Sequence, residues 1–523
     1  MRKPLLALAA VVLAVVVLAG CAGPSSTATT RPPGGPTGTI RVASADFGSE
    51  SLDQIVGNES IWGWAIYDSL LSFSDKGVII PNVAESFSMS ADGTWTFKIR
   101  KGIKFHDGSP LTAADVKFSV DRFGDTSVSR NPWSQYISEG YNKVSSTVID
   151  DYTFEFKAAR PEIHQSIAFA WTRIFPKKTY ETMGADAFRA HPVGSGPWKF
   201  VDLVSKTNIK FEANTEHWKT VPYFQNVIEN MVPEQSTRIA MTKANDVDIA
   251  LAIDYDKMAE LKKEGFRLES LGFPITSSIA FQATWLPEAG ATGDIRVRQA
   301  MSYALNRPEI CATWYQGFAK PGGAFFMHRG SFGWSDALIP ENYDLEKAKS
   351  LLKDAGYPDK FADPTITVFA PAPNQDFLLM LFGYWEKAGL KMKLEIVDMG
   401  VYWSMLFARP KEGDRNVGWA WPWASGSFFN STYHSANMYT SRGIHGTSND
   451  TKATEMYDAY LKEQDLTKAE KLWNEFQVYV KSLYINIGVA EVDPLIVVGK
   501  NLGKFTGENW ISLQDAYDGI QHP

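Results

Sequence analysis

The chain has 523 residues, of which 52 are basic and 59 acidic, so its formal net charge is −7. This acidic balance argues against nucleic acid as a partner, because proteins that bind nucleic acid present basic surfaces. The length exceeds what one hydrophobic core usually serves, so more than one domain is expected.

The amino terminus has the pattern of a lipoprotein signal peptide. Arg2 and Lys3 precede an apolar run over residues 5–18, and Leu-Ala-Gly-Cys follows, ending at Cys21. The run is too short for a stable membrane span. Similarity to lipoprotein precursors implies that residues 1–20 are removed and that Cys21 is diacylated, which leaves 50 basic against 59 acidic residues and a formal charge of −9. A plain secretory signal is the alternative, and either one exports the chain.

A polar tether is expected next, over residues 21–39. Beyond the cysteine it consists of Ser, Thr, Pro and Gly with almost nothing apolar, so it cannot join a core. A flexible segment of this length holds the folded part on the order of 20 to 25 Å from the membrane. If Cys21 carries lipid, Cys311 is alone and no internal disulfide forms; Cys311 is expected to be a small buried residue.

A tight hairpin is predicted early in the stretch 81–123. Asp92 and Gly93 lie between two alternating segments, and Asp-Gly supplies the positive φ that such a turn needs. The second segment has apolar side chains at every other position, so one face of that strand is expected to be buried. These side chains are Trp95, Phe97 and Ile99.

A capped helix is predicted to follow. Thr112 stands at the N-cap position, and Asp115 completes a capping box three residues later. His106 in the preceding turn is expected to be structural, because no second ligand is spaced to complete a metal or catalytic site. The apolar residues at helical spacing are Val116, Val120 and Phe123.

The order P-x-V-A-E-S, D-G, F-x-I-R, F-H-D-G and L-T-A-x-D-V within this stretch resembles family 5 of the extracellular solute-binding proteins. These are the peptide- and nickel-type receptors of ABC importers. The resemblance implies an extracytoplasmic receptor rather than an enzyme. It would be anchored to the cell membrane by lipid and act as a monomer without a cofactor. It would capture an oligopeptide or similar-sized solute and deliver it to an ABC permease and its ATPase.

Three further blocks extend the resemblance over most of the chain. PVGSGPW at residues 192–198 resembles a family turn, and the strand-like residues after it exclude a dinucleotide loop. Residues 294–305 and 343–357 resemble two family helices, although Asn306 replaces the usual Asp before Arg307. In the first helix the residues expected to face the core are Val297, Ala300, Met301 and Ala304. The second is expected to end at Gly356.

The resemblance implies an α/β fold with two lobes, of the periplasmic-binding-protein type (type II, cluster C), with an extra subdomain in lobe I. The chain is then expected to cross the hinge twice. Lobe I would comprise residues 40–80, 190–282 and 490–523, the subdomain residues 81–189, and lobe II residues 283–489. Ligand is expected between the lobes, where it would stabilise the closed form.

The ligand class depends on a segment late in lobe II. Peptide-binding relatives carry G-W-x-A-D-Y there, and the Asp pairs with the ligand's α-ammonium, which is costly to bury alone. This chain reads GWAWPWAS, so Trp419 matches the motif and is expected in the cleft, whereas Pro422 stands at the acidic position. Another carboxylate would have to substitute, and the candidates are Asp46, Glu50 and Glu59.

An oligosaccharide is the alternative ligand. Aromatic faces stack on sugar rings, and some relatives bind oligosaccharides. The competing interpretation is that several of these tryptophans are core residues, as expected of Trp198 and Trp218. Ser425 and Asn430 could bond a neutral polar ligand, although such residues often form turns. The predicted ligand-binding residues are Trp62, Trp64, Trp419, Trp421, Trp423, Ser425 and Asn430.

Two other functions find little support. His434 and His445 have no clear metal-ligand spacing, so no metal site is predicted. The rival class is an exported lipoprotein hydrolase. No G-x-S-x-G, H-E-x-x-H or P-loop motif occurs, so no catalytic residue is assigned. Paired carboxylates of a glycosidase would converge only in the fold.

Overall fold

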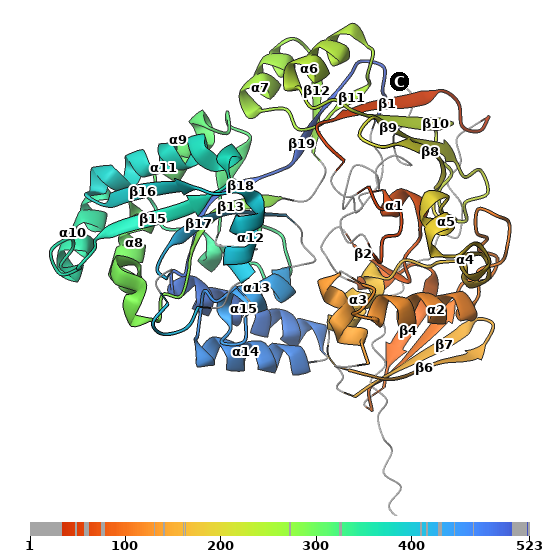
Figure 1. Ribbon diagram of the computed structural model, residues 1–523, viewed down its shortest axis with the longest axis horizontal. Helices are drawn as coiled ribbons and strands as arrows, with labels where there is room; N and C mark the ends of the chain where they lie inside the picture. Colours follow the sequence, from red (N-terminus) through yellow and green to blue (C-terminus); the bar gives the residue numbers. More distant parts are fainter. Residues whose placement is uncertain are drawn as a thin grey trace, which may run out of the picture.

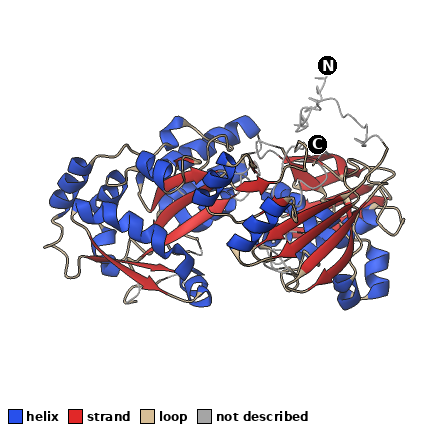
Figure 2. Cartoon of the chain, turned by 90° about the horizontal axis from the view of Figure 1, so that it is seen from above, coloured by secondary structure: helices blue, strands red, loops and turns tan. Residues whose placement is uncertain are grey.

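The computed structural model contains two lobes, each built on its own β-sheet (Figure 1). Helices accompany the strands in both lobes (Figure 2). The structure describes residues 34–47, 50–56, 62–74, 79–90, 92–129, 131–139, 142–159, 162, 164–270, 274–323, 327–407, 410–414, 417–426, 431–443, 445–463, 465–504 and 520. The expected signal peptide and lipidated Cys21 lie outside these residues, as does most of the expected tether.

Lobe I is built on a seven-stranded sheet. Its central strand β1 pairs in parallel with β10 and β11. In spatial order the strands are β12 (Arg267–Ser270), β19 (Leu495–Val498), β11 (Ile249–Ala250), β1 (Thr39–Ser44), β10 (Asn226–Met231), β9 (Asn208–Ala213) and β8 (Trp198–Val204). The helices of this part are α1 (Gly63–Ile66), α6 (Gln235–Ala244) and α7 (Tyr255–Lys263).

A smaller antiparallel sheet extends lobe I. Its order is β4 (Ala84–Met89), β5 (Thr94–Ile99), β7 (Thr153–Ala158) and β6 (Lys143–Asp150), beside the pair β2 (Leu71–Phe73) and β3 (Ile79–Pro81). Its helices are α2 (Ala113–Gly124), η1 (Pro132–Ile137), α3 (His164–Trp171), α4 (Lys177–Met183) and α5 (Ala185–Ala190). Buried side chains of both sheets form one continuous cluster, so the small sheet is part of lobe I.

Lobe II is built on a six-stranded sheet in the order β14 (Ala319–Pro321), β18 (Asn486–Val492), β13 (Ile275–Phe281), β17 (Ala420–Gly426), β15 (Thr365–Ala370) and β16 (Lys391–Ile396). One face packs on η2 (Pro287–Gly293), α8 (Ile295–Tyr303), α9 (Arg307–Thr313), α10 (Leu345–Ala355) and α11 (Gln375–Ala388). The other packs on α12 (Met399–Phe407), α13 (Ser431–Tyr439), α14 (Thr451–Lys462) and α15 (Leu466–Ser482). Two short 3-10 turns, η3 (Asp336–Leu338) and η4 (Ala372–Asn374), complete the lobe.

The chain crosses between the two large sheets twice, from β12 to β13 and from β18 to β19. The expected boundary after residue 282 is wrong for β13, because this strand pairs with β17 and β18 in the sheet of lobe II. Likewise, β18 continues to Val492, beyond the expected end of lobe II at residue 489. The positions of the two crossings therefore follow from strand pairing. The composition of the loop after each strand did not predict them correctly.

Local features predicted from the motifs are confirmed. Gly93 has a φ of 82° between the antiparallel strands β4 and β5. Thr112 and Asp115 form the capping box of α2. Asp344 caps α10, which ends at Gly356 with a φ of 78°. All the apolar residues expected to face inward from the hairpin and from the first two helices are buried, namely Trp95, Phe97, Ile99, Val116, Val120, Phe123, Val297, Ala300, Met301 and Ala304.

Candidate functional site

The carboxyl edge of the lobe I sheet is where both crossings leave that lobe. Strands β1, β10 and β11 run parallel, so they end at the same edge. Ser270 at the end of β12 lies opposite Leu495 at the start of β19. In open α/β sheets, ligands bind beyond the carboxyl ends of the parallel strands. This edge is therefore one half of the candidate site.

The other half is the carboxyl end of β17 in lobe II. Ile275, the first residue of β13, lies opposite both Gly426 at the end of β17 and Val492 at the end of β18. The end of β17 thus lies beside both crossings. Parallel pairing of β17 with β15 is confined to Ala420 and Val368, so residues 421–426 lie beyond that ladder.

Arg238 of α6 holds the lobe I edge together. Its guanidinium donates to the carbonyl oxygens of Val232 and Pro233 (both 2.7 Å), which follow β10. It also donates to Leu251 (2.9 Å) and Ala252 (2.6 Å), which follow β11. Burial lowers the pKa of Arg238, whereas nearby acidic side chains oppose that shift. One buried cation therefore fixes the two segments that border the site.

Trp62 is part of the lobe I core. Its Nε1 donates to Glu229 at 2.9 Å, and the Ser44 hydroxyl donates to the same carboxylate. The Trp62 ring packs edge-on against Phe47, with centroids 5.0 Å apart. Trp62 and Glu229 are both 0% exposed. The network attaches the loop after β1 to β10.

Trp64, two residues after Trp62, is half-buried. The guanidinium carbon of Arg173 lies 3.2 Å from the centroid of its ring. Trp171 packs edge-on against it, with centroids 5.4 Å apart. One face of this indole is therefore occupied by the protein's own cation.

Trp419, directly before β17, and Trp421 within it share a sheet face, because side chains two residues apart on a strand point the same way. That face is covered by α13, α14 and α15. Trp419 is 4% exposed and packs against Phe369, and Trp421 is 0% exposed beside the His445 ring. The expectation that Trp419 is exposed in a cleft is not met, because helices cover its face.

The structure describes the remaining predicted ligand residues only in part. Trp423 and Ser425 belong to β17, but their side chains lie outside the described residues, and Asn430 lies outside them altogether. Ligand binding by all seven residues stays a prediction. Trp198 is 0% exposed, as expected of a core residue. Trp218 is half-buried and donates to Asp68 at 3.0 Å.

Pro422, at the acidic position of the peptide motif, is buried and lies opposite Ile279 of β13. Its carbonyl oxygen accepts a hydrogen bond from the Tyr402 hydroxyl of α12 at 2.5 Å. Burial raises the pKa of Tyr402, which keeps that hydroxyl a donor. Proline has no N–H to donate to a second neighbouring strand, which agrees with the end of the pairing between β17 and β15 before Pro422.

The candidate carboxylates differ in what they do. Glu50 accepts from the Ser205 hydroxyl (2.6 Å) and the Lys206 amide (2.7 Å), so it stabilises a turn of lobe I. Asp46 is exposed at the carboxyl end of β1. Glu59 lies outside the described residues.

Asp398 is a carboxylate that the sequence reasoning missed. It is exposed beyond the carboxyl end of β16, and it accepts from the Gly400 amide at 2.7 Å. Tyr402, which reaches Pro422, lies one helical turn further on. The signal that could have found Asp398 is its place directly after the strand-like residues 391–397.

His106 and His445 play structural parts, whereas the side chain of His434 lies outside the described residues. His106 joins two sequence motifs: its Nε2 lies 2.9 Å from the Gly196 carbonyl oxygen, and its Nδ1 accepts from the Gly194 amide at 3.3 Å. Burial lowers the pKa of His106, and also that of the buried His445, to about 4. Cys311 is buried as expected, and burial raises its pKa to about 11. Within the described residues, no group of His, Cys, Asp and Glu could hold a metal ion.

Described residues of the two lobes touch both near the crossings and far from them. Near the crossings, Tyr255 of α7 packs edge-on against Tyr315, with centroids 5.2 Å apart. Far from the crossings, the Tyr457 side chain of α14 is hydrogen-bonded to Tyr136 of η1, and Tyr457 is 4% exposed. Contacts between the lobes therefore exist at both ends.

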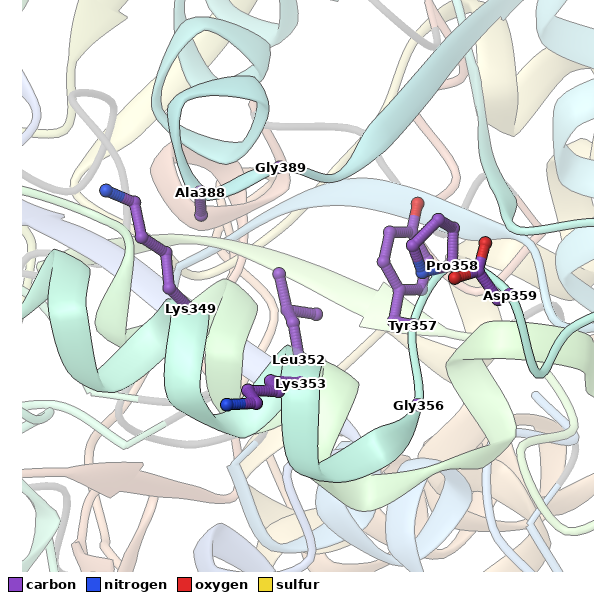
Figure 3. A pocket seen from close by; sticks show the side chains of 9 residues that line it. All are labelled: Lys349, Leu352, Lys353, Gly356, Tyr357, Pro358, Asp359, Ala388 and Gly389. Carbon is purple, nitrogen blue, oxygen red and sulfur yellow. The ribbon is translucent and has the colours of Figure 1, made fainter.

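A pocket lined by described residues lies elsewhere in lobe II (Figure 3). It has a volume of about 500 Å³ and lies where α10 and α11 end, at the amino edge of β15 and β16. Its lining residues are Lys349, Leu352, Lys353, Gly356, Tyr357, Pro358, Asp359, Ala388 and Gly389. The candidate site lies at the opposite edge of the sheet. In the described part of the chain, no helix is long and apolar enough to cross a membrane.

Two lobes joined by two crossings, with the carboxyl edges of both sheets beside them, define the class of two-lobe solute-binding proteins. The family description "Bacterial extracellular solute-binding proteins, family 5 Middle" matches residues 78–440. The chain therefore belongs to family 5 of the bacterial extracellular solute-binding proteins, whose members serve ABC importers.

Relatives of known name agree with this family. The chain is 27% identical over 384 residues to the dipeptide-binding protein of Escherichia coli, covering 68% of this chain and 70% of that protein. It is 28% identical over 452 residues to heme-binding protein A of Haemophilus influenzae, covering 79% of each.

Solved structures share the fold. NikA from Brucella suis in complex with Fe(III)-EDTA has a TM-score of 0.80 at 18% identity, covering 93% of this chain and 100% of that one. DppA from Helicobacter pylori in complex with the peptide STSA has a TM-score of 0.73 at 21% identity, covering 93% and 98%. At these identities the likeness concerns the fold alone.

Proposed function

We propose that this protein is an extracytoplasmic lipoprotein, without catalytic activity, that captures an oligopeptide or similar-sized solute between its lobes and delivers it to an ABC permease. The observation that carries this proposal is the meeting of two sheet edges at the crossings. A solute held there touches both lobes, so binding favours the closed arrangement. The dipeptide-binding relative and the peptide complex of a structural neighbour support a peptide as the first ligand to test.

A screen by thermal unfolding tests the proposal. The protein without residues 1–33 is heated alone, with a pool of tri- to pentapeptides, and with a pool of cello-, manno- and xylo-oligosaccharides. A ligand at a hundred times its dissociation constant adds about 2.7 kcal/mol to stability, which raises the unfolding midpoint visibly. A rise with peptides is expected. No rise with either pool would contradict the proposal as stated.

An oligosaccharide is the second candidate. The proline at the motif's acidic position favours it, because a sugar brings no ammonium that needs a carboxylate. The burial of Trp419 and Trp421 counts against it, since a stacking platform needs an open aromatic face. A rise of the midpoint with sugars alone would decide for this candidate.

A peptide ligand would need a carboxylate for its amino terminus, and Asp398 and Asp46 are the described candidates at the two sheet edges. If either one pairs with the ammonium, N-acetylation of a bound peptide and the matching Asp→Asn variant should weaken binding by similar factors. Asp186→Asn, in the first turn of α5, is the control at an exposed site. If acetylation leaves affinity unchanged, the amino terminus is not recognised by a carboxylate.

A further inference from the structure

The contact between the lobes that lies far from the crossings contains a pair of buried tyrosines. Tyr136 of η1, in lobe I, is 7% exposed, and Tyr457 of α14, in lobe II, is 4% exposed. Their side chains are hydrogen-bonded to each other. Burial raises the pKa of Tyr457 well above its usual value, so its hydroxyl stays protonated. Because the two hydroxyls belong to different lobes, their bond exists only while the lobes are together.

Each tyrosine ring is fixed by packing within its own lobe. In lobe I, Tyr136 packs against Trp133, with ring centroids 5.6 Å apart. In lobe II, Tyr457 packs against three aromatic rings of α14 and α15, which are Tyr460 (6.1 Å), Trp473 (6.4 Å) and Phe476 (5.8 Å). Because both rings are already held, little side-chain entropy is lost when the two hydroxyls bond.

The tyrosine pair and the crossings lie at different ends of the contact between the lobes. In Figure 1 the crossing strands β12, β13, β18 and β19 lie above α14 and α3, and η1 packs against α3. The other contact, between Tyr255 and Tyr315, lies beside the crossings, and the Tyr315 hydroxyl donates to Ser277 of β13 at 2.8 Å. When the lobes rotate about the crossings, displacement grows with distance from them. Opening therefore breaks the far pair, while the near contact can persist as a pivot.

We propose that Tyr136 and Tyr457 form a latch that stabilises the closed arrangement of the lobes and acts at a distance from the solute. This inference rests on the proposed function, since it concerns how the same receptor closes. The apparent affinity for a solute depends on the fraction of the protein that adopts the binding-competent arrangement. One hydrogen bond changes such an equilibrium by roughly three- to tenfold. The latch therefore increases affinity without adding a contact to the solute.

The test removes the bond and keeps the rings. Tyr136→Phe and Tyr457→Phe each delete one hydroxyl. Tyr460→Phe is the matched control, because Tyr460 lies in the same helix, is 2% exposed, and has its hydroxyl beside Thr432 of its own lobe. Calorimetric titration uses the peptide of the tri- to pentapeptide pool that raises the unfolding midpoint most. Affinity should fall roughly three- to tenfold in each latch variant and no further in the double variant, since all three lack the same bond. The control should bind like the wild type.

A second measurement needs no peptide. Small-angle X-ray scattering of the ligand-free protein should give a larger radius of gyration for the two latch variants than for the wild type and the control. Unchanged affinity together with unchanged scattering would overturn the latch while leaving peptide capture in place. Equal changes in Tyr460→Phe would overturn it as well, because they would reflect a general loss of packing. If no peptide binds but only the latch variants expand, the peptide function fails and the latch stands.

Discussion

Both lobes bury arginine that donates to backbone carbonyl oxygens, as Arg238 does in lobe I, but lobe I also contains a fully buried carboxylate paired with an arginine. In lobe I, the fully buried Asp53 pairs with Arg122, whose Nη1 lies 3.0 Å from the carboxylate. In lobe II, the buried Arg298 and Arg307 donate mainly to backbone carbonyl oxygens. An ion pair joins two side chains, whereas an arginine bonded to carbonyls joins whole chain segments. We therefore expect the lobes to respond differently to acid and to substitution.

Acid should affect lobe II most. His328 and His445 are buried there, and burial lowers the pKa of each from 6.5 to about 4. Because the folded state binds these protons less readily than the unfolded chain, stability is complete above pH 6.5 and falls as the pH approaches 4. The loss is about 3 kcal/mol for each histidine at pH 4. Hydrogen exchange at pH 7 and pH 4.5, corrected for intrinsic rates, should show faster opening of α14 and α15 than of β5 and β7.

Two results would weaken this comparison. Burial also lowers the pKa of His106 in lobe I to about 4, but lobe I has this one such histidine among the described residues, against two in lobe II, so its total loss should be smaller. Equal acid sensitivity of the two lobes would contradict the expected order. In His445→Phe, the slope of stability against pH should be shallower, and an unchanged slope would remove His445 from the explanation.

Arg298→Met should destabilise lobe II by about 3 kcal/mol. Its guanidinium donates to the carbonyl oxygens of Thr292 (2.6 Å), Leu483 (2.9 Å) and Tyr484 (3.0 Å), which lose their donor in the variant. Arg296→Met is the control in the same helix and the same motif. The Arg296 side chain is 38% exposed, pairs with Asp294 and donates to a single carbonyl oxygen, that of Asp354, so its loss should cost less, about 1 kcal/mol. Urea unfolding measures both, and similar costs would show that the carbonyl bonds matter little.

Asp53→Asn should destabilise lobe I by about 2 kcal/mol. The substitution leaves the Arg122 side chain, 11% exposed, without its carboxylate, although Asn can still accept one hydrogen bond. Replacing both residues, as Asp53→Asn/Arg122→Met, should recover part of the loss, because the unpaired charge is then gone. A double-mutant cycle of unfolding free energies measures the coupling free energy between Asp53 and Arg122. Absence of coupling would mean that the lobe I pair contributes nothing of its own.

Tyr402→Phe should have the smallest effect, about 1 kcal/mol, because one hydrogen bond to the Pro422 carbonyl is lost. Because this bond joins α12 to β17 at the candidate site, ligand affinity should change as well as stability. Tyr479→Phe, which removes a hydroxyl bond to Asp450 elsewhere in lobe II, is the control and should leave affinity unchanged. If the two variants bind ligand with equal affinity, Tyr402 does not contribute to the ligand site.

Local sequence pattern determined the elements that depend on neighbouring residues. The turn at Asp92 and Gly93, the capping box of α2 and the ends of α10 follow from backbone preferences and short hydrogen bonds. The apolar periodicity of the adjoining strand and helices correctly predicted their buried faces, and the ordered motifs indicated the family. These features need no knowledge of distant parts of the chain.

Only the tertiary structure decided which surfaces are covered and which segments meet. Alternation places Trp419, directly before β17, and Trp421 on one face of the sheet, but α13, α14 and α15 bury that face through contacts distant in sequence. Pairing with β17 and β18 moved β13 into lobe II. The same long-range packing left Asp398 exposed, one helical turn before Tyr402, whose hydroxyl donates to the Pro422 carbonyl. The periodicity of the sequence shows that one face of a strand or helix is apolar. Strand order and helix packing determine which other element covers that face.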